Sequence, residues 1–195
     1  MKIIIATHNM KKRAELERIL SPLGIEIVTD NEIGCNLREV EENGTTFFEN
    51  ALIKAKAGCE DSGLPCIADD SGLVVDALNG APGIFSARYS GVHGDDEANN
   101  DKLLKELENV PDEARTARFV CSVCCYFPDG RTVEATEACE GTIFRERHGN
   151  GGFGYDPLFC CNGQPFGEIS AEEKDKVSHR GKALRRLAEE LKNYI

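Results

Sequence analysis

The sequence has 195 residues, of which 41% are hydrophobic and 29% are charged, so it is long enough to bury its own core without a disulfide or metal. Its 34 acidic residues outnumber its 23 basic residues and give a net charge of −11, which argues against a general nucleic-acid-binding protein. No run of about 18 apolar residues is present, so no membrane span is predicted. The apolar run at 3–6 is too short for a signal-peptide core, and we expect a cytoplasmic protein.

The beginning of the sequence has the pattern of an α/β domain. Residues 2–6 are apolar and mostly β-branched, which predicts a strand, and residues 25–28 predict a second one. Residues 9–20 place an apolar stripe among charged side chains, which predicts an amphipathic helix with Asn9 as its N-cap. A strand, a helix and a strand in succession are typical of the start of an α/β fold. Residues 31–45 are polar, and we expect an irregular segment there.

The next part of the sequence predicts a helix, two short strands and a turn. Residues 46–61 open with the capping-box sequence Thr-Phe-Phe-Glu, which predicts the start of a helix. Residues 66–68 predict a short buried strand that ends at the acidic segment 69–72. Residues 73–75 predict another strand, and the Asn-Gly-Ala-Pro-Gly sequence at 79–83 predicts a turn.

The second half of the sequence adds two helices and a hairpin. Residues 95–107 predict an amphipathic helix, and residues 179–193 predict a C-terminal one. Residues 116–127 and 131–145 alternate in polarity around a Pro-Asp-Gly turn, which predicts a β-hairpin. Residues 149–154 are rich in glycine and predict a loop.

The nine cysteines raise the choice between a metal site and core packing. Cys121 and Cys124 form a C-x-x-C sequence, but it lies on a predicted strand, where Cys121 and Cys125 face one side and Cys124 the other. A zinc site of this type needs a tight turn and a second pair of ligands. We therefore predict that the cysteines are mostly small buried hydrophobic residues rather than zinc ligands or catalytic thiols.

The turn after the first strand is a candidate phosphate site. Thr7, Asn9 and Lys12 lie where a strand leads into a helix, and the N-terminus of a helix attracts anions. Hydroxyl, amide and lysine groups suit phosphate oxygens, although the sequence lacks a P-loop motif. The alternative is an ordinary helix cap with solvated lysines.

Two adjacent carboxylates, Asp69 and Asp70, follow a buried strand. Buried carboxylates are costly unless they are paired, hydrogen-bonded or bound to a cation. Mg²⁺ is usually held by one or two carboxylates plus substrate phosphates, and Glu41 or Glu42 could add a ligand. The alternative is a capped turn with one solvated aspartate.

Two further segments suit a planar base. The glycine-rich loop contains G-x-G-x-x-G, but Pro157 disfavours the helix that a dinucleotide site requires. Phe153 or Tyr155 could instead stack on a base, unless the loop is an ordinary turn. His179 and Arg180 lie at the start of a helix, where cations are unfavourable, which suggests a ligand rather than a solvated helix end.

Six segments in this order together resemble the inosine triphosphate pyrophosphatase family. They are Ala6-Thr7-His8-Asn9-x-x-Lys12, Phe48-Glu49-Asn50-Ala51, Ala68-Asp69-Asp70-Ser71-Gly72-Leu73, Gly80-Ala81-Pro82-Gly83-Ile84-Phe85-Ser86-Ala87-Arg88-Tyr89, Gly151-Gly152-Phe153-Gly154-Tyr155-Asp156-Pro157 and Glu173-Lys174-x4-His179-Arg180-Gly181. The resemblance covers essentially the whole chain. It implies a single domain over residues 1–195, an α/β fold with two lobes around a long central mixed β-sheet flanked by helices, and an active site in the cleft between the lobes. It also implies a homodimer.

The implied activity is Mg²⁺-dependent hydrolysis of ITP, dITP and XTP to the monophosphate and pyrophosphate, which clears damaged purines from the nucleotide pool. The residues that the resemblance places on the substrate are Thr7, His8, Asn9, Met10, Lys11, Lys12, Lys54, Ser71, Phe153, Gly154, Tyr155, Asp156, Lys174, His179 and Arg180. Within this set, Asn9 and Lys12 are expected to be the main phosphate contacts, and Phe153 is expected to stack on the base.

The resemblance places the metal on Glu41 and Asp70, with Glu42 as the alternative to Glu41, and makes Asp70 the proton acceptor that activates water. Two other functions stay open. One is a pyrophosphatase for a different modified base, and the other is a nucleotide- or RNA-binding module without catalysis.

Overall fold

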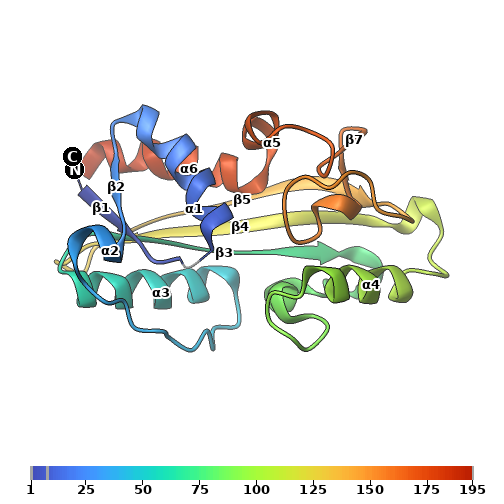
Figure 1. Ribbon diagram of the computed structural model, residues 1–195, viewed down its shortest axis with the longest axis horizontal. Helices are drawn as coiled ribbons and strands as arrows, with labels where there is room; N and C mark the ends of the chain where they lie inside the picture. Colours follow the sequence, from blue (N-terminus) through green and yellow to red (C-terminus); the bar gives the residue numbers. More distant parts are fainter. Residues whose placement is uncertain (1, 8, 195) are drawn as a thin grey trace. The chain divides into compact units, whose positions relative to one another are not determined.

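The computed structural model describes residues 2–7 and 9–194 (Figure 1). Within these residues, seven strands form one mixed sheet in the order β2-β1-β3-β4-β5-β6-β7. The strands are β1 (Lys2–Ile5), β2 (Glu26–Val28), β3 (Cys66–Val75), β4 (Thr116–Tyr126), β5 (Thr132–Ile143), β6 (Phe159–Cys161) and β7 (Gln164–Pro165). The α-helices are α1 (Met10–Leu20), α2 (Asp30–Ile33), α3 (Phe47–Ser62), α4 (Asp96–Glu106), α5 (Ala171–Val177) and α6 (His179–Leu191). The predicted α/β class is confirmed.

The sheet contains both strand directions. β1 pairs in parallel with β2 and with β3, and the register places Ile3 opposite Ile27 and Ile4 opposite Cys66. β6 pairs antiparallel with β5 and β7. The parallel part is the strand–helix–strand opening that the sequence predicts, because a parallel neighbour requires a crossover such as α1 or α3.

The chain divides into two compact units. The first comprises residues 1–70, 121–137 and 180–195, and the second comprises residues 71–120 and 138–179. The strands β3, β4 and β5 each contribute residues to both units.

The first unit has helices on both faces of its strands. On β1, Ile3 and Ile5 belong to the core cluster that includes Leu16 of α1 and residues of α6. Ile4 belongs to a separate cluster with Cys59 of α3. Figure 1 shows α1 and α6 on one side of these strands and α3 on the other, as the alternation of strand side chains requires.

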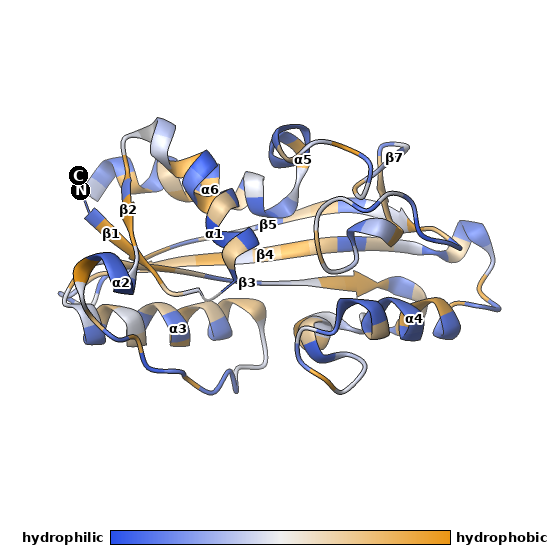
Figure 2. Ribbon diagram, viewed as in Figure 1, coloured by the Kyte–Doolittle hydropathy of each residue, from blue (hydrophilic) through white to orange (hydrophobic). Residues whose placement is uncertain are grey.

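The second unit has one apolar core. Leu103 of α4 packs with Leu73 of β3, Phe119 of β4 and Phe159 of β6. The rings of Phe119 and Phe159 lie 4.6 Å apart. Figure 2 shows the strands β3 and β4 largely apolar and α4 carrying many hydrophilic residues, which matches the amphipathic pattern of the sequence.

The cysteines lie where the strand pattern predicts. All nine are free thiols, and seven of them are buried. On β4, Cys121 and Cys125 belong to the core under α1 and α6, whereas Cys124 packs in the cluster with residues of α3. Among the described residues, no group of three or more His, Cys, Asp or Glu side chains is gathered for a metal ion. The burial of seven of the thiols agrees with the core-packing interpretation.

The structure corrects the sequence prediction around the two aspartates. The predicted strands at 66–68 and 73–75 are one strand, β3, which runs without a break through Asp69 and Asp70. The strand can continue through the two aspartates because each carboxylate has a polar partner. Lys12 contacts Asp69 on one side of the strand, and Asn50 contacts Asp70 on the other. The segment predicted to be irregular also contains the short helix α2, with a capping box from Thr29 and Glu32.

Most other predicted elements are confirmed within one or two residues. Asn9 caps α1, and β4 and β5 form the predicted hairpin, in which the amide of Phe127 donates to the carbonyl of Arg131. Within the described residues, the structure has no helix with the length and apolar character needed to span a bilayer.

Candidate active site

The turn between β1 and α1 is built by its own polar side chains. Asn9 Oδ1 accepts hydrogen bonds from the amides of Lys11 at 3.0 Å and Lys12 at 3.2 Å. Thr7 Oγ1 accepts from the amide of Asn9 at 3.2 Å. Thr7 and Asn9 therefore fix the start of α1, where the helix dipole favours an anion. Met10 and Lys11 are exposed on the same turn, and His8 lies outside the described residues.

Asp69 is buried against cations from two helices of the first unit. Its Oδ2 accepts from Lys12 Nζ at 3.0 Å and from Arg180 Nε at 3.2 Å. Arg180 also contacts the carboxylate of Glu15 on α1. The side chain of Asp69 is 2% exposed, so these charge pairs hardly meet solvent. They join β3, α1 and α6.

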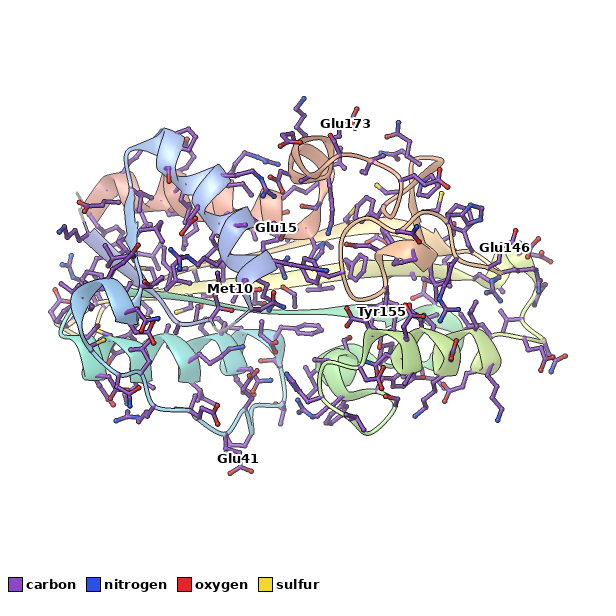
Figure 3. The ribbon with its side chains drawn as sticks, in the orientation of Figure 1. Met10, Glu15, Glu41, Glu146, Tyr155 and Glu173 are labelled. Atoms are coloured by element: carbon purple, nitrogen blue, oxygen red, sulfur yellow. The ribbon has the colours of Figure 1, made fainter. Side chains whose placement is uncertain are left out.

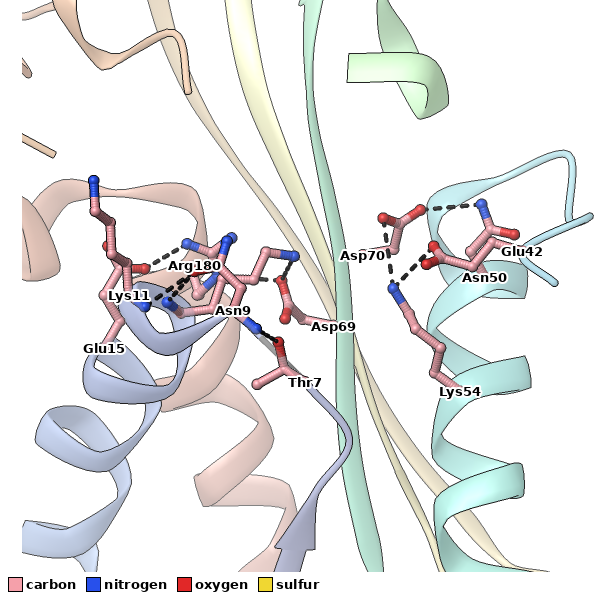
Figure 4. A network of polar contacts seen from close by, with 11 residues as sticks. Thr7, Asn9, Lys11, Glu15, Glu42, Asn50, Lys54, Asp69, Asp70 and Arg180 are labelled. Carbon is pink, nitrogen blue, oxygen red and sulfur yellow. Dashed lines mark hydrogen bonds and ion pairs between the residues drawn. The ribbon is translucent and has the colours of Figure 1, made fainter. Parts of the chain in front are cut away.

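Asp70 has a different set of partners on the opposite side of β3. Its Oδ2 accepts from Asn50 Nδ2 at 3.1 Å, and its Oδ1 lies 3.8 Å from Lys54 Nζ. Asn50 and Lys54 are one turn apart on α3. Asn50 Oδ1 also accepts from the amide of Gly44, so this side chain connects Asp70 to the loop before α3. Figure 4 shows the two aspartates facing away from each other across β3.

The two environments shift the pKa values of the aspartates in opposite directions. Burial alone would raise the pKa of Asp69, but the positive charges of Lys12 and Arg180 outweigh burial and hold it well below the usual range. Burial raises the pKa of Asp70, and the attraction of Lys54 and Lys12 only partly offsets that effect. Asp70 is therefore the more basic of the two carboxylates.

The structure distinguishes Glu41 from Glu42. Glu42 Oε2 accepts from Lys54 Nζ at 3.0 Å, so Glu42 and Asp70 share one lysine. Glu41 is exposed, and Figure 3 shows its side chain pointing away from the ribbon. The acidic residue beside Asp70 is thus the alternative, Glu42, and the geometry does not support Glu41.

The glycine-rich loop of the second unit is organised by a buried carboxylate. Asp156 Oδ2 accepts from the amide of Phe153 at 2.9 Å and from Lys174 Nζ at 2.6 Å. The ammonium of Lys174 also lies 4.7 Å from the centroid of the Phe153 ring. A side chain at Gly152 would overlap the carboxylate of Asp156, so glycine is required there. Phe153, Asp156 and Lys174 therefore form one cluster.

Two of the predicted base contacts are core residues in the structure. Tyr155 is 4% exposed, and its hydroxyl donates to the carbonyl of Ser86 at 2.8 Å. His179 is buried, and its ring stacks on Phe119 with a centroid distance of 4.7 Å. Tyr155 is therefore unsuited to stack on a base, because its ring is enclosed. Ser71 is partly exposed on β3 beside Asp70.

Several polar residues at these sites were not predicted from the sequence. Glu15 is a buried acid within the apolar stripe of α1, and it pairs with Arg180. The sequence had instead suggested that Arg180 contacts a nucleotide base. Asp96 and Asn100 of α4 both bond the backbone of Gly154. The sequence carries no local signal for these pairs, since their partners are distant in the chain.

Comparison with known proteins places these sites in context. A model described as the Ham1 family matches residues 3–190. A protein from Desulforamulus reducens named dITP/XTP pyrophosphatase is 50% identical over 191 residues, which are 97% of this chain and 94% of that protein. A protein of the same name from Mycobacteroides abscessus is 47% identical over 200 residues, covering 100% of this chain and 97% of that one.

Solved structures show the same fold. A HAM1 protein from Coxiella burnetii superposes with a TM-score of 0.88 at 38% identity and covers 99% of both chains. The Ham1 protein from Staphylococcus aureus superposes with a TM-score of 0.87 at 37% identity and covers 100% of both chains.

Proposed function

Because the chain belongs to the Ham1 family, we propose that it hydrolyses the non-standard purine nucleotides ITP, dITP and XTP to the nucleoside monophosphate and pyrophosphate. It is then a hydrolase that removes damaged purines from the nucleotide pool. The observation that carries the chemistry is the opposed pair Asp69 and Asp70, of which only Asp70 has its pKa raised.

The triphosphate is assigned to the first unit. The start of α1 offers backbone amides and the positive end of a helix dipole to phosphate oxygens. Lys12, held at 3.0 Å from Asp69, and Lys54, held at 3.0 Å from Glu42, add two cations at fixed positions. Arg180 is assigned an indirect role. It pairs with Asp69, and the carboxylate of Asp69 orients Lys12.

A divalent cation fits the carboxylates of Asp70 and Glu42. Both supply hard oxygen donors, and both contact the same lysine ammonium, so they are close in space. Two protein carboxylates plus substrate phosphates are a usual ligand set for Mg²⁺. When bound, the ion compensates the charge of the triphosphate in a protein whose own net charge is −11.

Asp70 is proposed to accept the proton of the attacking water. Burial makes its carboxylate a stronger base than a solvated aspartate, and Asn50 fixes its orientation through a hydrogen bond of 3.1 Å. Asp69 is the weaker base of the pair, because Lys12 and Arg180 lower its pKa and with it its affinity for a proton.

The base is assigned to the second unit. Phe153 offers a partly exposed ring for stacking, and Lys174 beside it offers N–H donors. The carbonyl at C6 of hypoxanthine or xanthine accepts from such donors, whereas the 6-amino group of adenine does not. A buried donor left unpaired costs about 1–3 kcal/mol, so a few such contacts give a large preference against ATP. Direct base contacts of His179 and Arg180 stay predictions.

The family resemblance extends the proposal to the whole protein. We propose one functional domain over residues 1–195 that acts in the cytoplasm as a homodimer, with no nucleic-acid or membrane partner. Analytical ultracentrifugation of the purified chain checks the dimer.

The test is pyrophosphate release from ITP, dITP, XTP, ATP and GTP, each with Mg²⁺ and with EDTA. We expect rapid release from the first three, little from ATP or GTP, and none with EDTA. Equal rates on all five nucleotides would contradict the base assignment but keep the phosphate chemistry. Tight RNA binding without hydrolysis of any nucleotide would favour the binding module instead.

A further inference from the structure

Two side chains of α4 hold both polar backbone atoms of Gly154. Asp96 Oδ2 accepts from the Gly154 amide at 2.8 Å, and Asn100 Nδ2 donates to the Gly154 carbonyl at 2.9 Å. Residues four apart lie on the same face of a helix, so one turn of α4 presents an acceptor and a donor side by side. We call Asp96 and Asn100 the α4 clamp.

The side chain of Asn100 is buried where it contacts the loop. Asn100 is 1% exposed, and its Oδ1 has no hydrogen-bond partner among residues 2–7 and 9–194. The side chain of Asn100 therefore bonds the loop through its amide nitrogen, which donates to the carbonyl of Gly154. A buried amide with one unsatisfied atom is unfavourable for the fold alone, and such groups in native proteins call for an explanation.

The clamped residue is directly next to Phe153. Gly154 has a φ of +61°, a conformation that only glycine adopts at little cost, so the backbone at the clamp favours glycine. On the other side of Phe153, the amide of Gly151 donates to the carbonyl of Gly167 at 2.8 Å. The Phe153 amide itself bonds Asp156. The backbone around the Phe153 ring is thus fixed on both sides, and the α4 clamp is one of its two outer anchors.

We propose that Asp96 and Asn100 are positioning residues that set the orientation of the Phe153 ring and thereby the affinity for the purine base. They do not touch the substrate in this role. The inference rests on the proposed function, because it requires that Phe153 stacks on a base.

Asn99 supplies a matched control on the same helix. It is 2% exposed, its Oδ1 accepts from the amide of Ser90 at 2.7 Å, and its Nδ2 donates to the carbonyl of Ala87 at 3.4 Å. Asn99 therefore has the same residue type, burial and helix as Asn100, but it holds the segment 87–90 instead of the loop that carries Phe153.

The experiment compares Asn100→Leu with Asn99→Leu for steady-state hydrolysis of ITP and for thermal stability. We expect Asn100→Leu to raise KM for ITP about 5-fold, the change that one lost hydrogen bond allows, with kcat changed by less than about 2-fold. Asn99→Leu is expected to lower stability to a similar extent without raising KM. Equal KM values in the two variants would overturn the proposal.

Variants of Asp96 keep the test informative if Asn100→Leu does not fold. Asp96→Ala removes the acceptor and is expected to raise KM, whereas Asp96→Asn keeps an acceptor oxygen and is expected to restore a KM near that of the unmodified protein. A rise in KM of the same size for both Asp96 variants would show that the acceptor is not what matters, and would overturn the proposal.

A double-mutant cycle separates this inference from the proposed function. If the clamp acts through the Phe153 ring, Asn100→Leu raises KM in the unmodified protein but not in a Phe153→Ala background. Additive effects would overturn the clamp's role while leaving Phe153 as the stacking residue. If Phe153→Ala alone leaves KM unchanged, the assignment of the base to Phe153 fails, and the clamp's role fails with it.

Discussion

The two sides of β3 around Asp69 and Asp70 have opposite electrostatic designs. On one side, Asp69 lies among the cations of Lys12 and Arg180, and its negative charge is fully compensated. On the other side, Asp70 meets the neutral amide of Asn50 at 3.1 Å and a lysine at 3.8 Å that Glu42 holds at 3.0 Å. Adjacent identical residues therefore differ because strand alternation gives them different neighbours.

If the proposed role of Asp70 is correct, one strand supplies both stability and reactivity. A carboxylate paired with two buried cations stabilises the fold but is a poor base, because its proton affinity is low. A buried carboxylate whose charge is only partly balanced by nearby cations lowers the stability of the fold. Such a carboxylate has a higher proton affinity and can bind a metal cation, as a catalytic site requires. In the proposed mechanism, the opposed partners of Asp69 and Asp70 divide these two tasks between neighbouring residues.

The largest expected effect is on stability and concerns Asp69. Asp69→Asn leaves the buried guanidinium of Arg180 and the ammonium of Lys12 with less negative charge, so we expect the free energy of unfolding to fall by about 3 kcal/mol. Asp70→Asn removes a carboxylate that burial disfavours, so we expect the free energy of unfolding to stay equal or to rise by up to about 1 kcal/mol. Urea unfolding of both variants measures the difference.

The two substitutions are isosteric and adjacent, so each is the control for the other. Equal losses of stability would contradict the division of tasks between the two sides of β3.

The second prediction concerns the acidic residue beside Asp70. Glu42→Gln is expected to raise the Mg²⁺ concentration required for half-maximal activity by about 10-fold or more, in the range seen when metal-site partners are removed. Glu41→Gln is expected to leave that concentration unchanged, because its side chain is exposed and points away.

Titration of ITP hydrolysis with Mg²⁺ measures both variants. A larger effect from Glu41→Gln than from Glu42→Gln would reverse the assignment and restore the interpretation that the sequence resemblance favoured.

The third prediction concerns the second unit. Phe153→Ala removes the ring proposed to stack on the base, so we expect KM for ITP to rise about 10-fold, as stacking of a base on an aromatic ring is worth about 1–3 kcal/mol. Phe153→Tyr keeps an aromatic face and serves as the control, with a KM near that of the unmodified protein. Steady-state kinetics measure both, and a fall in kcat at constant KM would argue against stacking.

The smallest expected effect is chemical and concerns the cysteines. Burial raises the pKa of Cys124 to about 12, so its thiolate is scarce at neutral pH. Burial also raises the pKa of Cys66. We expect iodoacetamide to label the partly exposed Cys160 in the native protein and to label these buried thiols only after unfolding. Mass spectrometry of native and denatured samples checks the order, and native labelling of Cys124 would contradict it.

The helices and strands could largely be predicted from the sequence, because they depend on local patterns. The Asn9 cap, the hairpin of β4 and β5 and the alternation of Cys121 and Cys124 follow from rules that act over a few residues. The resemblance also selected Asp70 and Lys54, which the structure brings together at 3.8 Å.

The secondary-structure prediction was wrong at residues 69–72, where residues distant in the sequence determine the local structure. Aspartate is rare in strands, so the segment 69–72 was predicted to end one. The partners that make a strand possible are Lys12, which is 57 positions away from Asp69, and Arg180, which is 111 positions away. The contact of Glu42 with Lys54 and that of Tyr155 with Ser86 could not be predicted either, because each depends on the fold of a loop.

The most direct test of the central claim is the rate of pyrophosphate release from ITP by Asp70→Asn, measured on protein shown to be folded by its urea transition. If Asp70 is the proton acceptor and a metal ligand, kcat falls by at least about 100-fold, the contribution of a general base, while the fold is as stable as before. A stable Asp70→Asn variant that releases pyrophosphate at the rate of the unmodified protein would contradict the assignment.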